Sequence, residues 1–254
     1  MGISQLIKKI FVKTSYGIWG KGIIDELPMP MKEQKEWDAF INLSFSQEGE
    51  DLVLYRLLGH QTKGLYVDVG AHHPYRFSNT FKFYLLGWRG INIDPLPGSK
   101  KILDEKRPGD INIEAGVLNR NGEALTYYMF QDPAYNTFDE TVAAQRQLPG
   151  SDYIFLEKKQ IACYRLADIL EKHLPKNTSI DFLSIDVEGM DLEVLQSNNW
   201  ELYRPRYIIA ESLSTKLAEE FNAPISVFLQ QQGYELTAKT ANSLLFTDKQ
   251  QNQQ

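Results

Sequence analysis

The feature that most constrains this fold is an alternation of short apolar runs with helix-like segments, in which several apolar runs end in an acidic residue or a glycine. The apolar runs, which we predict to be strands, cover 65–69, 91–93, 111–113, 181–186 and 206–210. The intervening segments with helical spacing cover 79–86, 99–106, 190–197 and 225–232. This alternation is typical of a doubly wound α/β sheet, in which helices connect parallel strands.

The C-terminal part of the chain departs from the alternation. Gly233 is a good C-terminal cap for the helix predicted over 225–232. Two strand-like runs, 234–238 and 243–247, then follow with only a short turn between them. We therefore predict an α/β, Rossmann-like fold with a mostly parallel seven-stranded sheet, a C-terminal antiparallel hairpin and helices on both faces.

The remaining segments define the predicted domain limits. Residues 1–44 are predicted to be an N-terminal helix followed by an irregular lead-in, and 45–247 to be one α/β domain. A helix should begin within 46–51 and end near Gly59. After an extra strand at 125–130, the polar stretch 131–160 is predicted to be a long loop that serves as a lid or insert, and 248–254 a disordered tail.

Composition excludes several classes of protein. The chain has 254 residues, 43% of them hydrophobic, a net charge of −6 and a pI of about 5.3. A surface that follows nucleic acid phosphates needs clustered Lys and Arg, so we expect no nucleic acid partner. The single cysteine, Cys163, excludes an internal disulfide framework and a cysteine-based zinc site. A reducing cytoplasmic location fits best.

The first thirteen residues combine apolar positions at helical spacing with Lys8, Lys9 and Lys13. The apolar run is too short for a membrane span or a signal peptide. A basic amphipathic helix can lie on an anionic membrane, which would give peripheral contact at the inner membrane face. The alternative is a helix packed on the domain or on a second subunit of a homo-oligomer.

Four predicted strands end in acidic residues or glycine at the same edge of the sheet. Asp68-Val69-Gly70, Asp94, Asp186 and Glu211 occupy these ends. Ligands of open α/β sheets bind beyond the carboxyl ends of the strands. Gly70 would let the backbone approach a ligand closely, and Asp94 is placed to accept hydrogen bonds from the hydroxyls of an adenosine ribose.

The loop after the first strand argues against a dinucleotide. A pyrophosphate site favours the pattern G-x-G-x-x-G, whereas residues 70–75 have the sequence GAHHPY with one glycine. S-adenosylmethionine has no phosphate and carries a positively charged sulfur. The acidic edge formed by Asp68, Asp94 and Asp186 suits that cation better than a diphosphate.

Five blocks of sequence, in order, resemble the FkbM-type methyltransferases. They are FSQEGED at 45–51, YVDVGAHHPYRFSNT at 66–80, GWRGINIDP at 87–95, IDFLSIDVEGMDLEVL at 180–195 and YRPRYIIAES at 203–212. The resemblance covers about 45–247 and leaves out 1–44 and 131–160. It implies the class I methyltransferase form of the Rossmann-like fold. It further implies methyl transfer from S-adenosylmethionine to a hydroxyl, most often of a sugar or natural product.

The resemblance also implies a set of cofactor-binding residues. They are Gln47, Glu48, Asp68, Gly70, Ala71, His72, Ser78, Asn79, Asp94 and Asp186. By this resemblance, residues 68–72 would surround the methionine part of the cofactor, and Asp94 would hold its ribose. Ser78 and Asn79 would donate to the cofactor carboxylate at a helix N-terminus. Gln47 and Glu48 would close the site, and residues 114–117 would flank the adenine.

A sugar hydroxyl is a poor nucleophile until a base or a metal ion assists it. Our first hypothesis is that Asp186 and Glu188 orient and deprotonate the acceptor. His72 is the rival base. For His73, catalysis and a structural hydrogen bond are equally good interpretations. A second hypothesis is a divalent cation held by Asp186 and Glu211, with or without Glu188. Oxygen ligands alone would favour Mg²⁺ or Ca²⁺.

The acceptor is the least determined part of the hypothesis. Aromatic and polar side chains that suit a sugar occur near the motifs and in the predicted lid, although such residues are often core: Tyr75, Arg76, Phe77, Trp88, Tyr135 and Phe138. A sugar hydroxyl in a glycan or glycosylated metabolite is the first choice, and a polyketide or other small metabolite the second. A nicotinamide-dependent oxidoreductase and a non-catalytic cofactor-binding scaffold remain as alternative classes.

Overall fold

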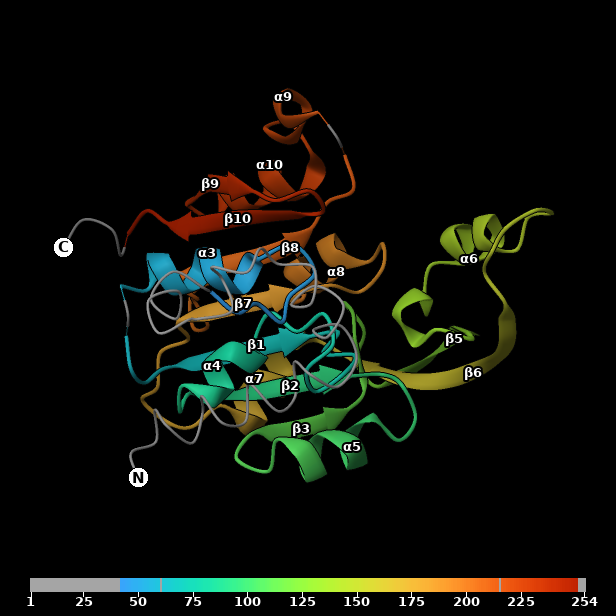
Figure 1. The fold of residues 1–254 in the computed structure, drawn as a ribbon, viewed down its shortest axis with the longest axis horizontal. Coiled ribbons are helices and arrows are strands. Elements are labelled where there is room, and N and C mark those ends of the chain that lie inside the picture. The colour runs from blue at the N-terminus through green and yellow to red at the C-terminus, as the bar shows by residue number, and fades with distance from the viewer. Residues whose placement is uncertain (1–41, 60, 215, 251–254) are drawn as a thin grey trace, which may run out of the picture. The chain divides into compact units, whose positions relative to one another are not determined.

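A computed structural model describes residues 42–59, 61–214 and 216–250 (Figure 1). Contacts divide the chain into two units, Met1–Leu43 and Ser44–Gln254, and the second unit carries every element described below. The amphipathic helix predicted in the first thirteen residues and most of the predicted lead-in lie outside the described residues. None of the helices in the described ranges has the length and apolar character needed to span a bilayer.

Seven strands form the main sheet, in the order β3-β2-β1-β7-β8-β10-β9. Their bounds are Leu65–Val69 (β1), Arg89–Asp94 (β2), Ile111–Glu114 (β3), Phe182–Ile185 (β7), Tyr207–Glu211 (β8), Tyr234–Lys239 (β9) and Ser243–Asp248 (β10). The pairs among β3, β2, β1, β7 and β8 are parallel, whereas β10 pairs antiparallel with both β8 and β9. The predicted mostly parallel sheet with a C-terminal antiparallel hairpin is confirmed.

Helices cover both faces of this sheet. The helices of the second unit are Glu50–Leu57 (α3), Phe81–Leu85 (α4), Ser99–Lys106 (α5), Glu140–Arg146 (α6), Leu166–His173 (α7), Asp191–Gln196 (α8), Leu217–Glu220 (α9) and Pro224–Gln231 (α10). Because side chains alternate along a strand, Val67 and Val69 of β1 face one core while Tyr66 faces the other.

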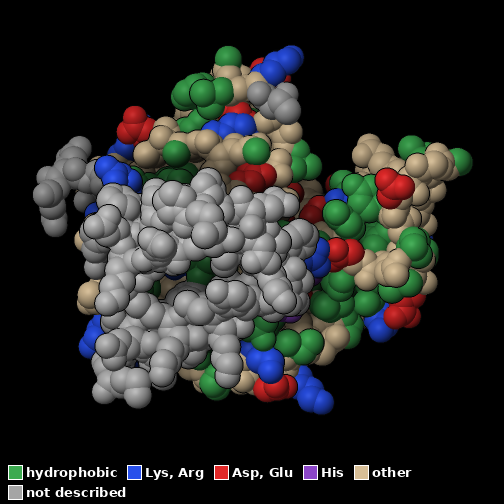
Figure 2. All heavy atoms as spheres, in the orientation of Figure 1, with side chains coloured by type: hydrophobic (Ala, Val, Ile, Leu, Met, Phe, Trp, Pro, Cys, Tyr) green, Lys and Arg blue, Asp and Glu red, His purple; other side chains and the backbone are tan. Residues whose placement is uncertain are grey.

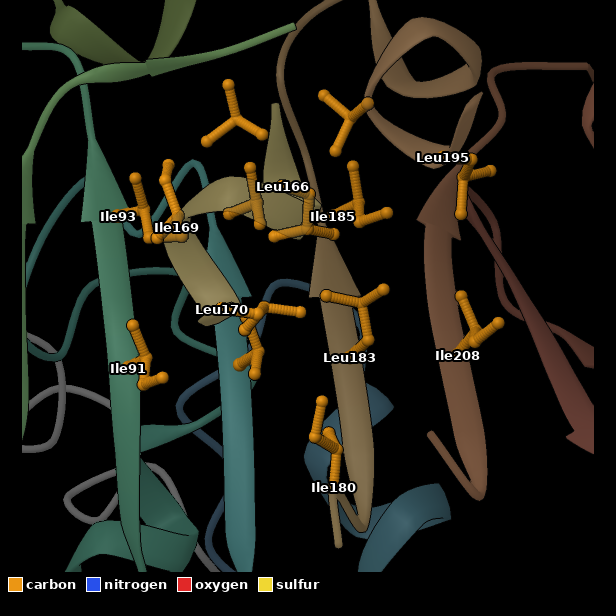
Figure 3. Packing of buried hydrophobic residues seen from close by; sticks show 14 of the residues in the cluster. Ile91, Ile93, Leu166, Ile169, Leu170, Ile180, Leu183, Ile185, Leu195 and Ile208 are labelled. Atoms are coloured by element: carbon orange, nitrogen blue, oxygen red, sulfur yellow. The ribbon is translucent and has the colours of Figure 1, made fainter. Parts of the chain in front are cut away.

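The larger core lies between the sheet and helices α7, α8 and α10. Figure 3 shows how its aliphatic side chains converge from β2, β7, β8 and α7: Ile91, Ile93, Leu183, Ile185, Ile208, Leu166, Ile169 and Leu170. The smaller core, on the opposite face, packs α3 and α4 against aromatic residues of the sheet, including Trp88 and Phe182. Burial on both faces explains why the central strands are continuous apolar runs.

A second, three-stranded sheet forms a lobe beyond the carboxyl ends of the parallel strands (Figure 1). It consists of Gly116–Val117 (β4), Glu123–Phe130 (β5) and Phe155–Tyr164 (β6), in the order β4-β6-β5. The connection between β5 and β6 contains a 3₁₀ turn, Pro133–Tyr135 (η3), and α6. We refer to residues 131–154 as the insert.

The lobe corrects the prediction that 131–160 lacks regular structure. β6 is rich in charged residues, and most of its positions are half-buried or exposed, so no apolar alternation reveals it as a strand. Its conformation is fixed by antiparallel pairing with β5 over nearly its whole length. Helix α7 was also not predicted, although Leu166, Ile169 and Leu170 have helical spacing.

Most boundaries differ from prediction by one or two residues, and two of these differences are informative. α4 begins at Phe81 rather than at residue 79: Thr80 is its N-cap, and the Ser78 hydroxyl accepts the backbone N–H groups of Thr80 and Phe81 in the turn just before the helix. Asp248, assigned to a disordered tail, is the last residue of β10. It is buried and accepts two hydrogen bonds from Arg204, at 2.9 and 2.7 Å. Residues 251–254 lie outside the described part of the chain.

Candidate active site

A cavity of about 340 Å³ lies at the carboxyl ends of β1, β2, β7 and β8. Its floor comes from the loops after these strands, and its outer wall comes from β5 and the insert. Of the predicted cofactor residues, those that line it are Gln47, Asp68, Gly70, Ala71, His72, Ser78, Asn79, Asp94 and Asp186. Glu188 and Glu211, predicted for catalysis and metal binding, line it as well. The fold thus brings together predicted residues that lie far apart in the sequence, from Gln47 to Glu211.

The loop after β1 is held by its own backbone. The N–H groups of Gly70 and Ala71 both donate to the Ile93 carbonyl, at 2.9 and 3.2 Å. The N–H of His72 donates to the Asp94 carboxylate at 2.7 Å. Since three successive amides are engaged within the protein, they are not free to cradle a diphosphate. This geometry supports the argument that the loop is not a dinucleotide site.

Gly70 is required for a reason other than the predicted approach of a ligand. Its φ of +83° lies in the left-handed region, and a Cβ at this position would lie 1.8 Å from the Asp186 carbonyl oxygen. The absent side chain therefore allows the β1 loop to pack directly on the loop after β7. This packing sets the distance between residues 70–72, the predicted cofactor loop, and the catalytic candidates Asp186 and Glu188.

Asp94 organises the end of β2. Each of its carboxylate oxygens accepts one backbone N–H, from His72 at 2.7 Å and from Leu96 at 2.8 Å. Burial raises the pKa of this carboxyl to about 6, although those two amides oppose the shift. The remaining lone pairs of its oxygens are the acceptors that a ribose would use.

The methionine side of the predicted cofactor site is a buried hydroxyl network. Asp68 accepts a hydrogen bond of 2.6 Å from Thr80, and burial raises its pKa. The Asn79 amide donates to the Ser184 hydroxyl at 3.1 Å. Ser78 lines the cavity, but its oxygen already accepts from the start of α4. The predicted donation by Ser78 and Asn79 to a cofactor carboxylate stays a prediction.

Three carboxylates gather at the ends of β7 and β8. One oxygen each from Asp186, Glu188 and Glu211 lies within 4.8 Å of the others, and these three residues are called the acidic rim below. A fourth carboxyl, Asp191 at the start of α8, is buried beside them. The Glu188 backbone has a φ of +56°, an unusual conformation for a residue with a side chain.

The acidic rim binds protons more tightly than isolated carboxylates do. Asp186 is open to the cavity, but the surrounding walls remove it from bulk water. That desolvation, together with Asp191 and Glu188, raises its pKa well above the ordinary value. Desolvation and the charge of Asp186 raise the pKa of Glu211 to about 10. Burial raises the pKa of Asp191 to about 7. At neutral pH, Glu211 therefore carries a proton.

The insert holds Glu188 in position. Arg146 of α6 donates to the Glu188 carboxylate and forms an ion pair with it. The Thr137 hydroxyl donates to the Glu188 carbonyl at 2.8 Å. Burial raises the pKa of Glu188, and Arg146 opposes that shift, so Glu188 keeps more of its charge than the rest of the acidic rim. The residue with the strained backbone is thus fixed at both its side chain and its main chain.

The insert also contributes an aromatic wall. The rings of Tyr135 and Tyr153 pack edge to face with centroids 4.6 Å apart, and both line the cavity. The Arg146 guanidinium lies over both rings and donates to the Tyr135 carbonyl at 2.7 Å. Arg76, in the loop after β1, donates two hydrogen bonds to Asp132 of the insert, at 3.0 and 2.7 Å. This ion pair ties the β1 loop to the insert.

The two histidines differ in their surroundings. Burial, together with the charges of Arg76 and His73, lowers the pKa of His72 to about 4, so its ring is neutral at pH 7. Its Nε2 is buried and makes no hydrogen bond within the described residues. His73, in contrast, accepts the N–H groups of Tyr75 and Arg76 at its Nδ1. The structural role considered for His73 is the one the geometry supports.

Several other candidates lie away from the cavity. The Glu48 carboxylate accepts the Asn242 N–H at 2.7 Å and does not line the cavity. Within 114–117, Ala115 and Val117 line it, while Glu114 accepts the N–H of Gly98. Trp88 is 1% exposed and belongs to the core, so it is not available to a substrate.

Several cavity residues could not be identified from the sequence, among them Tyr127, Arg146, Tyr153 and Ser184. Ser184 is one of the four buried positions of β7 and looks like an ordinary strand position. Tyr127 was placed on a strand, but nothing local indicated that this strand covers the site. Arg146 and Tyr153 fell in the predicted loop. The Asp139 N-cap, which accepts the N–H groups of Thr141 and Val142, is the local signal that would have located α6.

The residues present fit S-adenosylmethionine. The acidic edge offers several carboxylates to a positively charged group. The unpartnered Nε2 of His72 and the open lone pairs of Asp94 offer polar contacts. Ala115 and Val117 offer an apolar surface for a base. The donor set therefore suits a cationic nucleoside without a phosphate.

The sheet order, the antiparallel β10 and a cavity at the ends of β1 and β2 define the class I methyltransferase form of the Rossmann-like fold. The family model described as "Methyltransferase FkbM domain" matches residues 68–236, and the chain belongs to this family. The match leaves out the block at 45–51 that the resemblance included. Among curated proteins, no sequence matches the chain.

Solved structures with similar folds are methyltransferases of low sequence identity. The METTL16 MTase domain has 16% identity and a TM-score of 0.45, covering 78% of this chain and 65% of its own. A precorrin-6Y C5,15-methyltransferase from Geobacter metallireducens has 14% identity and a TM-score of 0.41, with 77% and 84% covered. A methyltransferase from Geobacter sulfurreducens has 17% identity and a TM-score of 0.39, with 90% and 96% covered.

Proposed function

We propose that this methyltransferase transfers the methyl group of S-adenosylmethionine to a sugar hydroxyl in a glycan or glycosylated metabolite. The observation that carries the proposal is the position of Glu188. It stands beside two further carboxylates, next to the cofactor loop and below an aromatic wall. Such a site can accept a proton from a hydroxyl while an apolar ring face packs against tyrosines.

When bound, S-adenosylmethionine supplies an electrophilic methyl group on a positively charged sulfur. The residues that would hold it are the loop from Gly70 to His72, with Asp68 and Asp94, and the apolar pair Ala115 and Val117. The protein's main contribution is then alignment, because displacement at carbon requires the nucleophile opposite the departing sulfur.

The ion pair with Arg146 makes Glu188 the best base in the acidic rim. Arg146 opposes the rise in the pKa of Glu188 that burial causes, whereas Glu211 holds a proton at neutral pH. Glu188 would accept the hydroxyl proton as the acceptor oxygen bonds to the methyl carbon. Asp186 and Glu211 would hydrogen-bond to neighbouring hydroxyls and so orient the sugar. His72 is the weaker rival, since a pKa of about 4 makes its ring a poor proton acceptor.

A divalent cation offers a second way to activate the hydroxyl. The acidic rim has the oxygen ligands that Mg²⁺ or Ca²⁺ prefer, within a suitable distance of one another. Arg146 competes with such an ion for the Glu188 carboxylate. Methyl transfer that survives exhaustive chelation would remove this mechanism, whereas loss of activity that Mg²⁺ restores would establish it.

The charge of the cavity lining favours a neutral acceptor. Its two cations, Arg76 and Arg146, are each paired with a carboxylate. This favours a sugar over a phosphorylated molecule or nucleic acid. A polyketide or other small metabolite is the second candidate acceptor, because the tyrosines would accept an apolar ring equally well.

The test combines binding with turnover. Calorimetric titration of the purified chain should show binding of S-adenosylhomocysteine and none of NAD. When neutral sugar glycosides are present, the chain should also convert S-adenosylmethionine to S-adenosylhomocysteine. Binding of NAD would favour an oxidoreductase, and binding of the methyl donor without turnover on any acceptor would favour a scaffold. A complex with S-adenosylhomocysteine would show which carboxylate faces the transferred methyl group.

A further inference from the structure

A second cavity, of about 390 Å³, adjoins the first on the outer side of the aromatic wall. The two share the lining residues Arg76, Pro133, Tyr135 and Tyr153. The side chains that line only the outer cavity are Phe130, Gln131, Asp132, Asp152 and Ile154. The tyrosine pair therefore stands at the boundary, with the candidate reaction site on one side and the outer cavity on the other.

Hydrogen bonds within the protein hold the boundary between the two cavities in a fixed shape. Arg76 and Asp132 are joined by two hydrogen bonds, and Asp132 also accepts the N–H of Ala134 at the start of η3. Arg146 donates to the Tyr135 carbonyl from the opposite side. Because these contacts already exist before a ligand arrives, binding would order few additional groups.

The aromatic rings remain accessible despite this support. Tyr135 is 37% exposed, Tyr153 is 40% exposed and Ile154 is 56% exposed. Hydrophobic side chains gather over the lobe that carries them (Figure 2). An exposed aromatic face with a fixed orientation is a surface on which the C–H groups of a sugar ring can pack.

Polar groups surround these rings and are available to hydroxyls. Within the described residues, no hydrogen bond engages the side chain of Gln131 or Asp152. Arg76 is neutralised by Asp132, so the outer cavity presents no uncompensated cation to a phosphate or carboxylate. Hydrogen-bonding groups beside an aromatic face, without excess positive charge, match a neutral sugar better than an anionic or purely apolar group.

From this geometry we infer that the outer cavity is a subsite for a second neutral sugar ring of the acceptor. The inference rests on the proposed function, because the first ring must present its hydroxyl to Glu188 in the inner cavity. The second ring would then pass Tyr135 and Tyr153 and hydrogen-bond to Gln131 and Asp152. The acceptor class is thereby narrowed to disaccharides and longer glycans.

The test compares matched acceptors on the full chain. Methyl glycosides of neutral hexoses and deoxyhexoses are assayed beside disaccharides in which a second neutral hexose is attached. Methyl transfer gives kcat/KM, and saturation-transfer NMR on the protein loaded with S-adenosylhomocysteine shows which rings touch it. We expect at least one disaccharide to exceed its monosaccharide by about tenfold in kcat/KM, with contacts to both rings.

Variants then assign the advantage to the outer cavity. The double variant Gln131→Ala/Asp152→Ala, and separately Tyr153→Ala, should bring the ratio of disaccharide to monosaccharide toward one. Tyr164→Ala is the matched control, because Tyr164 is 39% exposed on β6 and lines neither cavity. Circular dichroism of each variant would exclude misfolding as the cause.

The outcomes separate the two proposals. If monosaccharides are methylated but disaccharides gain nothing, or the variants leave the gain intact, the subsite is wrong while the proposed function stands. If no saccharide is methylated or bound although S-adenosylhomocysteine binds, the sugar acceptor and the subsite both fail.

Discussion

Two groups of charged side chains in this domain are built in opposite ways. Near the amino-terminal half of β1–β3, Arg107 is fully buried and donates to Asp110 at 3.0 Å, Tyr66 at 2.7 Å and Thr80 at 2.9 Å. At the carboxyl ends of β7 and β8, the acidic rim gathers three carboxylates around the single guanidinium of Arg146.

The first group matches its charges. Asp110 also accepts the N–H of Gly90 and the amide of Asn92, both at 2.9 Å, so its carboxylate is well satisfied. Burial opposes the charge of Arg107, but Tyr66 and Asp110 outweigh it and raise the pKa of the guanidinium. A buried pair with this many partners fixes how β1, β2 and the start of α4 fit together.

The second group leaves negative charge in excess. Its carboxyls respond by binding protons, which costs stability as the pH rises but leaves them able to exchange a proton with a ligand. The comparison teaches that burial alone does not mark a functional site. The mark is an imbalance of charge at a cavity, where a substrate or cofactor can relieve it.

Removing the cation of the balanced group should have the largest effect on stability. Arg107→Met leaves Asp110 buried and unpaired, so we expect the free energy of unfolding to fall by about 3–5 kcal/mol. Urea denaturation followed by circular dichroism measures this change. Arg120→Met is the control, because Arg120 forms only surface pairs and should change stability by about 1 kcal/mol or less. Equal effects of the two substitutions would contradict the contrast drawn here.

Removing the base of the unbalanced group should act on turnover instead. Glu188→Gln keeps the shape of the side chain but cannot accept a proton, so we expect kcat to fall by a factor of about 10²–10⁴. Affinity for S-adenosylhomocysteine, measured by calorimetry, should stay close to that of the unaltered chain. Glu193→Gln on α8 serves as the control and should keep normal turnover. Normal turnover by Glu188→Gln would refute the assignment of the base.

Per pH unit, the smallest effect on stability is expected from the protonation of Glu211. The folded-state pKa of Glu211 is about 10 against an ordinary value of 4.5, so the folded protein holds a proton that the unfolded chain has lost. Stability should therefore fall as pH rises through this window, by at most about 1.4 kcal/mol per pH unit for this group. Glu211→Gln should flatten the curve of unfolding free energy between about pH 5 and pH 9. An unchanged slope would show that Glu211 does not hold the proton.

The main sheet could be predicted from sequence because its signals are local. Runs such as 207–210 are apolar and buried on both faces, and Gly233, with a φ of +87°, ends α10 where the pattern predicted. The acids at the strand ends followed from the same logic, since parallel strands deliver their carboxyl ends to one edge. Asp68, Asp94, Asp186 and Glu211 all line the cavity.

The insert could not be predicted in the same way. β6 is defined by its pairing with β5, and Arg146 acquires its role only through the contact with Glu188, which comes from a distant part of the chain. A second reason for Gly70 also came only from the tertiary structure, because a Cβ at this position would collide with the Asp186 carbonyl oxygen.

By itself, the sequence determined the α/β alternation, the cofactor loop with Asp94 at the next strand end, and the absence of a dinucleotide fingerprint. These features depend on hydrophobic periodicity and on residues close together in the chain. The tertiary structure alone decided which carboxylate has a cation beside it, which ones take up protons, and where an acceptor can lie. Charge balance and cavity shape depend on side chains that meet only after long segments have packed, so no local pattern encodes them.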